Sequence, residues 1–357
     1  MISIPASIND LTAEWFSSIL RLARNTNTVQ SVDLQRLGES DSLSGYVYRA
    51  NLSYTNNTKD NPKSLIVKLP RPRNLRTSSL QQAYEREVRF YQKLAPTINI
   101  NVPKLIYSDI ENETGDYVLV LEDFPALLTR SIEAGATSEQ AFELFNLMAK
   151  LHAQYWNSSK LAEFEFLNRL ASFIERFNNN FPQYLPIFLS RFSNYLQSEE
   201  MAIFKVLPES FKTVVEPLLD APQTLVHNDI SMKNILIQYS SEVPTFVLID
   251  WAMVGQGPGV RDVSFFIETS IPHPMRSEHE KSFLGYYWQR LRGEGVTEYS
   301  FDQLMDDYCR SVILDLGRMV TVGGQKVISP AAEFNVRVEI RGRTGSAKEL
   351  DLHSFLK

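Results

Sequence analysis

The amino-acid sequence predicts an α+β protein of two parts, in which a small sheet with one important helix precedes a mainly helical part. The length of 357 residues exceeds the ~100–200 residues typical of one domain, which favours two domains or one large bilobal unit. Short runs rich in Val, Tyr and Ile recur through the first 124 residues. After Phe124 apolar residues recur every three or four positions, as they do in helices.

The first part opens with a helix over residues 11–23, where apolar residues share one face after the possible N-caps Asn9 and Asp10. Strand character follows in SVDLQRLG, GYVYRANLSY and SLIVKLP, with the polar TNNTKDNPK as a hairpin-type loop. A second helix is expected over residues 79–94. Two further strands, NVPKLIYSDI and DYVLVLEDF, are separated by the turn-like ENETG.

The second part is helical from residue 138 to about residue 219, and again in SEHEKSFLGYYWQRLRG and FDQLMDDYCRSVILDLGRMV. Between these stretches, TLVHNDISMKNILIQ and VLIDWAMVGQGPG are strand-like, and we expect adjacent strands over residues 234–238 and 245–250. From about Ser329 onward, strand-like alternation is mixed with Gly and charge. A strand pair, a loosely held tail and an altered terminus all remain open for this last stretch.

Composition and charge disfavour several classes of protein. An apolar fraction of 43% and a charged fraction of 22% are typical of a globular protein with a real core. The net charge is −6 and no basic stripe is present, which disfavours a nucleic-acid partner because phosphate contacts need clustered Lys and Arg. Five scattered histidines and one cysteine make a zinc site improbable.

The single cysteine, Cys309, cannot form an internal disulfide, so we expect a reducing compartment and a buried structural thiol. The start, MISIPASIND, lacks the charged and apolar regions of a secretion signal. No stretch approaches the ~18 apolar residues that span a bilayer. These features predict a cytoplasmic protein without a membrane span, and they leave its oligomeric state open.

Polar residues interrupt the two strand-like segments of the second part. His227, Asp229 and Asn234 form H-x-D-x-x-x-x-N, and Asp250 follows in I-D-W. A charge near a core is costly unless hydrogen bonds or a metal ion compensate for it. Phosphoryl transfer suits such a set, because one carboxylate, Asp229, can orient an acceptor hydroxyl and take its proton. The amide oxygen of Asn234 and the carboxylate of Asp250 can hold Mg²⁺ together with phosphates.

These residues resemble the motifs of the kinase-like small-molecule phosphotransferase superfamily, the group of aminoglycoside, choline and ecdysteroid kinases. The resemblance is closest to the ecdysteroid-kinase-like branch. LIVKLP resembles the family's third strand, YEREVRFYQKL the helix that follows, YVLVLEDF the segment leading into the hinge, and LMAKLHAQYW a Leu-His-Ala helix. The match spans roughly residues 10–320, and the order of the five pieces is more specific than any one piece.

The resemblance implies a bilobal protein-kinase-like fold. Residues 1–124 would form a nucleotide-binding lobe with an antiparallel sheet, and residues 125–328 a mainly helical catalytic and substrate lobe. Residues 329–357 would form a tail of uncertain structure. A short hinge would lie near Glu122.

The resemblance also implies roles for individual residues, with ATP and Mg²⁺ as cofactors. Lys68 would contact the nucleotide phosphates and pair with Glu87, for which Glu85 is a competing candidate. Asp229 would be the catalytic residue, and Asn234 and Asp250 would be the metal ligands. Backbone groups in the hinge would hold adenine, at Glu122, Asp123 and Phe124.

The sequence departs from the family at some positions. The glycine-rich loop contains only Gly38 and Gly45 rather than G-x-G-x-x-G, so phosphate cover is expected from backbone amides near Ser44 and Gly45. Position 228 is Asn, where Gly is frequent in these kinases. The Arg of H-R-D and the A-P-E segment of protein kinases are both missing, which favours a small-molecule kinase.

Several residues also have simpler structural interpretations. His227 is expected to brace the catalytic loop rather than to transfer a proton, and His152 to be a satisfied core histidine. Asp262 fits the N-cap of a helix, although the resemblance implies that it also braces the catalytic loop. Lys233 is expected to be solvated, with contact to phosphate as the alternative.

The predicted function is ATP- and Mg²⁺-dependent transfer of the γ-phosphate to a hydroxyl of a small molecule. The alternative is a catalytically idle relative that binds a nucleotide or another ligand, which the thin glycine loop favours and the retained motif residues disfavour. The acceptor would lie between the catalytic loop and the helices of residues 138–219. Five aromatic residues there could line an apolar pocket or belong to the core: Phe164, Phe166, Phe173, Phe177 and Tyr184.

Overall fold

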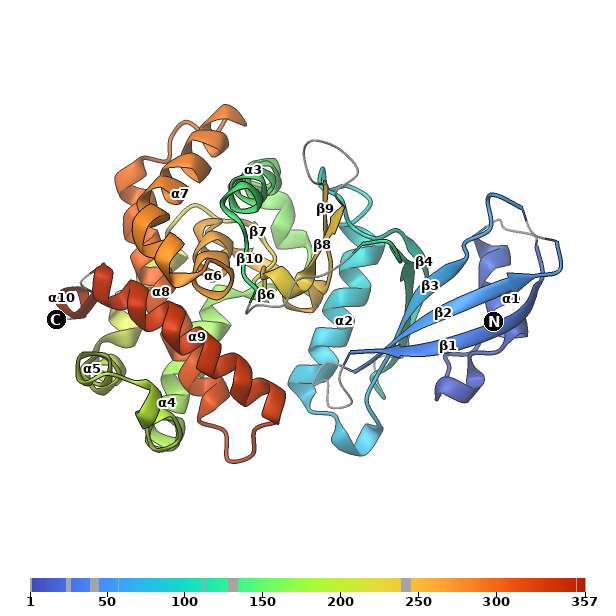
Figure 1. Ribbon diagram of the computed structural model, residues 1–357, viewed down its shortest axis with the longest axis horizontal. Helices are drawn as coiled ribbons and strands as arrows, with labels where there is room; N and C mark the ends of the chain where they lie inside the picture. The colour runs from blue at the N-terminus through green and yellow to red at the C-terminus, as the bar shows by residue number, and fades with distance from the viewer. Residues whose placement is uncertain are drawn as a thin grey trace. The chain divides into compact units, whose positions relative to one another are not determined.

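A computed structural model of the protein separates into two compact units (Figure 1). Unit 1 comprises Met1–Leu128 and Val247–Met253, and unit 2 comprises Thr129–Phe246 and Val254–Lys357. The structure describes residues 2–23, 27–38, 45–56, 58–111, 113–127, 134–238, 245–350 and 352–356.

Unit 1 is built on a five-stranded sheet in the order β1-β2-β3-β5-β4, in which every neighbouring pair is antiparallel. This confirms the predicted antiparallel sheet of the N-terminal part. Its strands are β1 (Val29–Leu37), β2 (Tyr46–Tyr54), β3 (Ser64–Leu69), β4 (Leu105–Glu111) and β5 (Asp116–Glu122). Short 3-10 helices of this unit are η1 (Ile8–Asp10), η2 (Arg73–Leu75) and η7 (Trp251–Met253).

The two faces of this sheet carry different elements. On one face, helix α1 (Ala13–Leu22) packs its apolar side chains against alternate residues of β3, Leu65 and Val67. Successive residues of a strand point to opposite faces. Lys68 therefore points away from α1, and its ammonium group meets helix α2 (Ser78–Lys93). The alternation along β3 separates an apolar core from the face that carries charge.

Helix α1 differs from its prediction at both ends. Its N-cap is Thr12, whose hydroxyl oxygen accepts a hydrogen bond of 3.2 Å from the N–H of Trp15. The predicted cap Asp10 instead forms a capping box with Ser7 at the start of η1. Leu22, the last residue of the helix, is 66% exposed and does not join the buried stripe.

Unit 2 is mainly helical, as predicted for the C-terminal part. Its helices are α3 (Ser138–Gln154), α4 (Leu170–Phe192), α5 (Ser198–Val215), α6 (Val260–Ser270), α7 (His273–Gly293), α8 (Phe301–Gly323), α9 (Pro330–Glu349) and α10 (Leu352–Phe355). Its 3-10 helices are η3 (Ser159–Glu163), η4 (Ser193–Tyr195), η5 (Glu216–Leu219) and η6 (Met232–Asn234). None of the helices in the described ranges has the length and apolar character needed to cross a membrane.

The remaining strands of the chain are short. Strands β6 (Asn168–Arg169), β10 (Gly255–Gly257) and β7 (Thr224–Val226) form a three-stranded sheet in that order. Strands β8 (Ile235–Gln238) and β9 (Thr245–Leu248) form a two-stranded sheet, the adjacent pair that the sequence predicts. The H-x-D-x-x-x-x-N motif begins directly after β7 and ends directly before β8.

Aromatic side chains of α4 and α5 form much of the core of unit 2. Phe181 and Phe211 meet edge to face with centroids 5.0 Å apart. Helix α8 approaches them closely because it carries glycine, since a Cβ at Gly317 would lie 2.6 Å from the ring of Phe211. Phe177 is buried in this core, so of the two interpretations, pocket lining and core, the structure supports the core.

The other aromatic candidates for an acceptor pocket differ among themselves. Phe173 is buried and stacks on Phe177, so it also belongs to the core. Phe164 and Phe166 are half-buried and meet edge to face, with ring centroids 5.7 Å apart. Tyr184 is half-buried. These three side chains keep some surface that a ligand can reach.

The last part of the chain forms helices, which rules out the strand pair that the sequence left open (α9 and α10 in Figure 1). Burial follows Ala332, Val336 and Ile340, which are spaced by four residues as on one face of a helix. The local pattern of apolar residues at every second position therefore does not describe the packing. Arg318 of α8 binds Glu339 of α9 at 2.5 Å, which fastens the helix to its neighbour.

Candidate active site

A buried lysine on the charged face of the sheet connects three elements of unit 1. The Nζ atom of Lys68 on β3 lies 2.6 Å from Glu87 Oε1 on α2 and 3.3 Å from Asp250 Oδ1. The side chains of Lys68 and Glu87 are 15% and 4% exposed, whereas that of Asp250 is 32% exposed. Asp250 is thus the one of the three that a ligand from solvent can reach most easily.

The electrostatics of this group hold the lysine in its charged form. Burial acts to lower the pKa of Lys68, but the carboxylates of Asp250 and Glu87 outweigh it and raise that pKa above its ordinary value. Burial raises the pKa of Glu87, and the positive charge of Lys68 opposes that rise. Each charge depends on the other, because either one alone would be buried without compensation.

Helix α2 also positions the segment around Asp250. The indole of Trp251 stacks on Phe90 of α2 with centroids 4.0 Å apart and planes 8° apart. Arg86 Nε of the same helix donates a hydrogen bond of 2.9 Å to the carbonyl oxygen of Ala252. These contacts explain why residues 247–253 belong to unit 1, although they are distant from it in sequence.

Asp250 adopts a left-handed backbone conformation with φ of +64°. Residues other than Gly, Asn and Asp rarely adopt this backbone conformation. Residues in such sparsely populated conformations cluster at functional sites. The conformation places Asp250 at the end of the strand-like run and directs its carboxylate to Lys68.

The predicted catalytic residue lies on the loop after β7 in unit 2. The amide nitrogen of Asn234 donates to the backbone oxygen and to Oδ2 of Asp229, at 2.9 Å in both cases. The ammonium group of Lys233 lies 3.4 Å from the same Oδ2 atom. Because the nitrogen of Asn234 faces Asp229, its oxygen is the atom that can face a cation.

A buried aspartate of α6 holds this loop. The carboxylate of Asp262 accepts hydrogen bonds of 2.8 Å from the backbone N–H groups of His227 and Asn228. Asn228 has φ of +64°, a conformation that explains why glycine is suited to this position and why Asn is tolerated. The N-cap of α6 is Gly259, so the predicted capping role of Asp262 is wrong and the predicted bracing role is confirmed.

The support of this aspartate extends to two further helices. His152 of α3 is fully buried, with Nε2 3.3 Å from Asp262 Oδ2 and Nδ1 2.8 Å from the hydroxyl of Tyr287 on α7. This confirms His152 as a satisfied core histidine. His227 is also fully buried, and its Nδ1 atom accepts a hydrogen bond of 3.3 Å from the N–H of Asp229, which confirms its bracing role.

The predicted hinge residues Glu122 and Asp123 are anchored by their side chains. The carboxylate of Asp123 is bound by Arg49 of β2 and Ser64 of β3, and the carboxylate of Glu122 accepts a hydrogen bond from the N–H of Lys104. Phe124 follows them and is half-buried. No local pattern indicates these contacts, because Arg49 is one of several polar residues along β2, together with Asn51 and Ser53.

The glycine-poor loop is described only at its edges. Ser44 lies outside the described residues. Gly45 has φ of +119°, and a Cβ there would lie 2.7 Å from the carbonyl oxygen of Leu69, so close packing beside β3 requires glycine. Glycine at position 45 therefore has a structural reason, which is packing beside β3.

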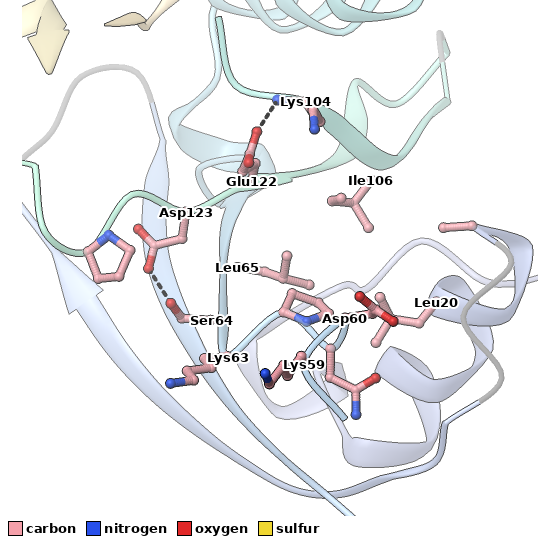
Figure 2. A pocket seen from close by; sticks show the side chains of 14 residues that line it. Leu20, Lys59, Asp60, Lys63, Ser64, Leu65, Lys104, Ile106, Glu122 and Asp123 are labelled. Carbon is pink, nitrogen blue, oxygen red and sulfur yellow. Dashed lines mark hydrogen bonds between the residues drawn. The ribbon is translucent and has the colours of Figure 1, made fainter. Parts of the chain in front are cut away.

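A cavity of about 500 Å³ lies on the face of the unit 1 sheet that α1 covers (Figure 2). Leu20 of α1, Leu65 and Ile106 contribute apolar surface, and lysines such as Lys63 contribute charge. Leu65 and Lys68 point to opposite faces of β3. Lys68, Glu87 and Asp250 do not line the cavity, whereas Ser64, Glu122 and Asp123 do.

The two predicted metal ligands carry oxygen donors, Asp250 in unit 1 and Asn234 in unit 2. Asp250 and Asn234 offer carboxylate and amide oxygens, which Mg²⁺ prefers. Among the described residues, no group of three or more His, Cys, Asp or Glu side chains is arranged as a metal site. A Mg²⁺ ion that takes most of its ligands from phosphates and water does not need such a group.

Comparisons with solved structures place the fold. The GDP complex of aminoglycoside 2'-phosphotransferase-IIIa has a TM-score of 0.57 and 13% identity, covering 93% of this chain and 98% of that chain. Choline kinase from Cryptosporidium parvum Iowa II has a TM-score of 0.55 and 13% identity, covering 91% and 93%. Choline kinase LicA from Streptococcus pneumoniae has a TM-score of 0.52 and 15% identity, covering 92% and 96%. This confirms the α+β fold of these kinases.

A curated relative and a family model match by sequence. The Caenorhabditis elegans protein named uncharacterized oxidoreductase dhs-27 is 21% identical over 401 residues, covering 99% of this chain and 47% of that protein. The chain thus spans about half the length of that relative. The model of the ecdysteroid kinase-like family matches residues 39–295. The resemblance found in the sequence is confirmed, and the chain belongs to the ecdysteroid kinase-like family.

Proposed function

We propose that the protein transfers the γ-phosphate of ATP, in the presence of Mg²⁺, to a hydroxyl group of a small molecule. Its family and its structural neighbours support a general phosphotransferase role. The observation that carries the proposal is the buried Lys68, bound at 2.6 Å by Glu87 and 3.3 Å from Asp250. A lysine placed in this way suits contact with nucleotide phosphates beside a metal ligand.

In the proposed mechanism each residue has one role. Lys68 binds the α- and β-phosphates, and Glu87 fixes the position of that lysine. Asp250 and the amide oxygen of Asn234 hold Mg²⁺, which supplies charge neutralisation on the phosphates when it is bound. Asp229 orients the acceptor hydroxyl and takes its proton.

The nucleotide is proposed to be held mainly by backbone groups. Those of Glu122, Asp123 and Phe124 would hold adenine, and amides near Ser44 and Gly45 would cover the phosphates. The side chains of Glu122 and Asp123 are engaged within the protein, which supports a backbone role for them. We also propose that the protein acts in the cytoplasm, without a nucleic-acid partner.

A second candidate function is a nucleotide-binding protein that no longer transfers phosphate. The observation that favours it is the close contact of Gly45 with Leu69, which accounts for a glycine at this position without a phosphate. The retained set of Lys68, Glu87, Asp229 and Asp250 favours transfer.

The test is ATP consumption by the purified protein with Mg²⁺ against pooled aminoglycosides, choline-like amines, sugars and sterols. We expect acceptor-stimulated turnover, and we expect Asp229→Asn to lower kcat by roughly 10²–10⁴-fold, the range of general base catalysis. Binding of Mg-ATP, measured by calorimetry, should remain. Asp220→Asn is the matched control, because Asp220 is an exposed aspartate of the same unit.

The outcomes separate the two functions. Turnover that Asp229→Asn loses and Asp220→Asn keeps supports the small-molecule kinase. Binding of Mg-ATP without turnover in any pool favours the second candidate. Unchanged turnover in Asp229→Asn would remove the catalytic role from that residue.

A further inference from the structure

The carboxylate of Asp123, directly after β5, accepts hydrogen bonds from residues of strands β2 and β3. Arg49 of β2 donates from Nε to Asp123 Oδ2 at 2.7 Å and from Nη2 to Oδ1 at 3.1 Å. Ser64 of β3 donates its hydroxyl to Oδ2 at 2.5 Å (Figure 2). The side chain of Asp123 is only 3% exposed. A bidentate arginine pair of this kind fixes orientation as well as distance.

The strand register explains how these residues meet. Leu65 of β3 faces Glu122 at the end of β5, and Arg49 of β2 faces Ile66 of β3. Asp123 follows Glu122 directly, so its side chain reaches back across the start of β3 to β2. The three contacting residues come from positions 49, 64 and 123, far apart in the chain.

The preceding residue is fastened in the opposite direction. The carboxylate of Glu122 accepts a hydrogen bond of 3.2 Å from the N–H of Lys104, beside β4 (Figure 2). The N–H of Glu122 donates to the carbonyl oxygen of Lys104 at 2.9 Å. Two successive residues are thus tied to opposite neighbours, Glu122 towards β4 and Asp123 towards β3 and β2. The backbone at this point is held from both sides.

We propose that Arg49 and Ser64 are positioning residues for the nucleotide base. By holding Asp123, they set the backbone of residues 122–124, apart from the N–H of Glu122 that Lys104 already engages, in the arrangement that recognises adenine. This inference rests on the proposed function, because it assigns the means by which the hinge selects its nucleotide. Neither side chain touches the nucleotide itself.

The physical reason is preorganisation. A backbone that is already fixed loses little conformational entropy on binding, and its hydrogen-bonding groups discriminate between bases only if they stay in place. Removing Arg49 leaves a buried carboxylate without its counter-charge, so the segment must shift to expose Asp123 to water. A lysine at position 49 keeps the charge but loses the two-point geometry.

The experiment compares Arg49→Met with Arg36→Met, a matched arginine removal on the adjacent strand β1. We expect Arg49→Met to weaken Mg-ATP binding by roughly tenfold, the change that one lost charge-assisted hydrogen bond produces, with kcat almost unchanged. The preference for ATP over GTP should fall in the same variant. Ser64→Ala should act in the same direction with a smaller effect. Arg36→Met should leave affinity and preference as in the wild type.

A double variant separates positioning from stability. Arg49→Met with Asp123→Asn removes both charges, so the melting temperature should recover relative to Arg49→Met alone. ATP affinity and the preference for ATP over GTP should stay low, because the two hydrogen bonds from Arg49 to the side chain of residue 123 are still missing. Recovery of base preference together with stability would overturn the proposal and leave a purely structural ion pair.

The controls distinguish failure of this inference from failure of the proposed function. A wild-type protein that binds neither Mg-ATP nor Mg-GTP in calorimetry would overturn the proposed function and this inference with it. A wild-type protein that binds Mg-ATP, with an unchanged affinity and base preference in folded Arg49→Met, would overturn the inference alone.

Discussion

At the scale of single residues, the candidate site depends on charges that are stable only together. Lys68 and Glu87 are both nearly inaccessible to solvent, so each would be costly without the other. Glu85, the competing candidate from the sequence, is 42% exposed and lies 3.9 Å from Arg89 of the same helix. The structure thus separates two glutamates that are only two positions apart.

The two glutamates provide a matched test. We expect Glu87→Gln to lower kcat/KM for ATP by about tenfold or more, equivalent to ~1.4 kcal/mol, because Lys68 loses the carboxylate that fixes it. Glu85→Gln should leave kcat/KM within about twofold, as expected for a solvent-exposed charge. Steady-state kinetics with varied ATP measure both. Equal losses in the two variants would contradict the assignment of Glu87.

The ionisation of Asp262 makes the stability of the folded protein depend on pH. Burial acts to raise its pKa, but hydrogen bonds from His152 and from the N–H of His227 outweigh it and hold the pKa below the ordinary 3.8. The folded state therefore prefers the ionised carboxylate. Its contribution is present above the unfolded pKa and is lost as pH falls through the folded pKa.

We therefore expect the stability of the wild type to decline as pH falls below about 5, where carboxyls of the unfolded chain begin to take up protons, and on through the lowered folded pKa of Asp262. Asp262→Asn should be less stable at neutral pH and should show a shallower decline over the same range. Urea unfolding midpoints at each pH measure this difference. Parallel declines in the variant and the wild type would show that other carboxylates dominate the acid response.

At the scale of elements, the position of helix α9 depends on close packing at a glycine. A Cβ at Gly342 of α9 would overlap the carbonyl oxygen of Glu268 in α6, so the two helices meet along a glycine. Gly285 of α7 has no atom within 4 Å of its would-be Cβ. A substitution of alanine for glycine would therefore clash at position 342 and meet open space at position 285.

We expect Gly285→Ala to raise the free energy of unfolding by about 0.5–1 kcal/mol, because alanine has the better helix propensity and nothing obstructs its methyl group. Gly342→Ala should lower it by roughly 1–3 kcal/mol, the usual cost of forcing extra atoms into a packed contact. Chemical denaturation measures both. A stabilising Gly342→Ala would mean that α9 is not packed against α6.

At the scale of the whole molecule, the chain retains the fold of small-molecule kinases at about one identical residue in eight, with 13% identity to two of the solved structures. Few residues are needed to specify such a fold, because apolar patterning tolerates many substitutions. The motif residues are a separate requirement, since phosphate and metal binding need particular side chains.

Binding of nucleotide should therefore be visible in the stability of the whole protein. We expect saturating Mg-ATP to raise the melting temperature, since a ligand at 100 times its Kd stabilises the folded state by ~2.7 kcal/mol. Asp250→Ala should abolish most of this shift by weakening the binding of the metal and its nucleotide. Adding a chelator of Mg²⁺ to the wild type should have the same effect. A shift that survives both changes would remove Asp250 from the metal site.

The sequence by itself determined the division into an antiparallel sheet part and a helical part, and it predicted the residues that would carry the chemistry of phosphoryl transfer. Strand and helix patterns repeat over a few neighbouring residues, so short windows of sequence reveal them. The family resemblance rested on residues in a characteristic order, such as Lys68, Glu87 and Asp229, and order is also a property of the sequence.

Tertiary structure alone decided which distant residues meet. The segment around Asp250 belongs to unit 1 because Arg86 and Phe90 of α2 and Lys68 of β3 hold it. Strand-like alternation near Val336 gave way to a helix, because burial against other helices follows a spacing of four residues. Such outcomes depend on the free energy of contacts between segments far apart in the chain, and no local pattern records that energy.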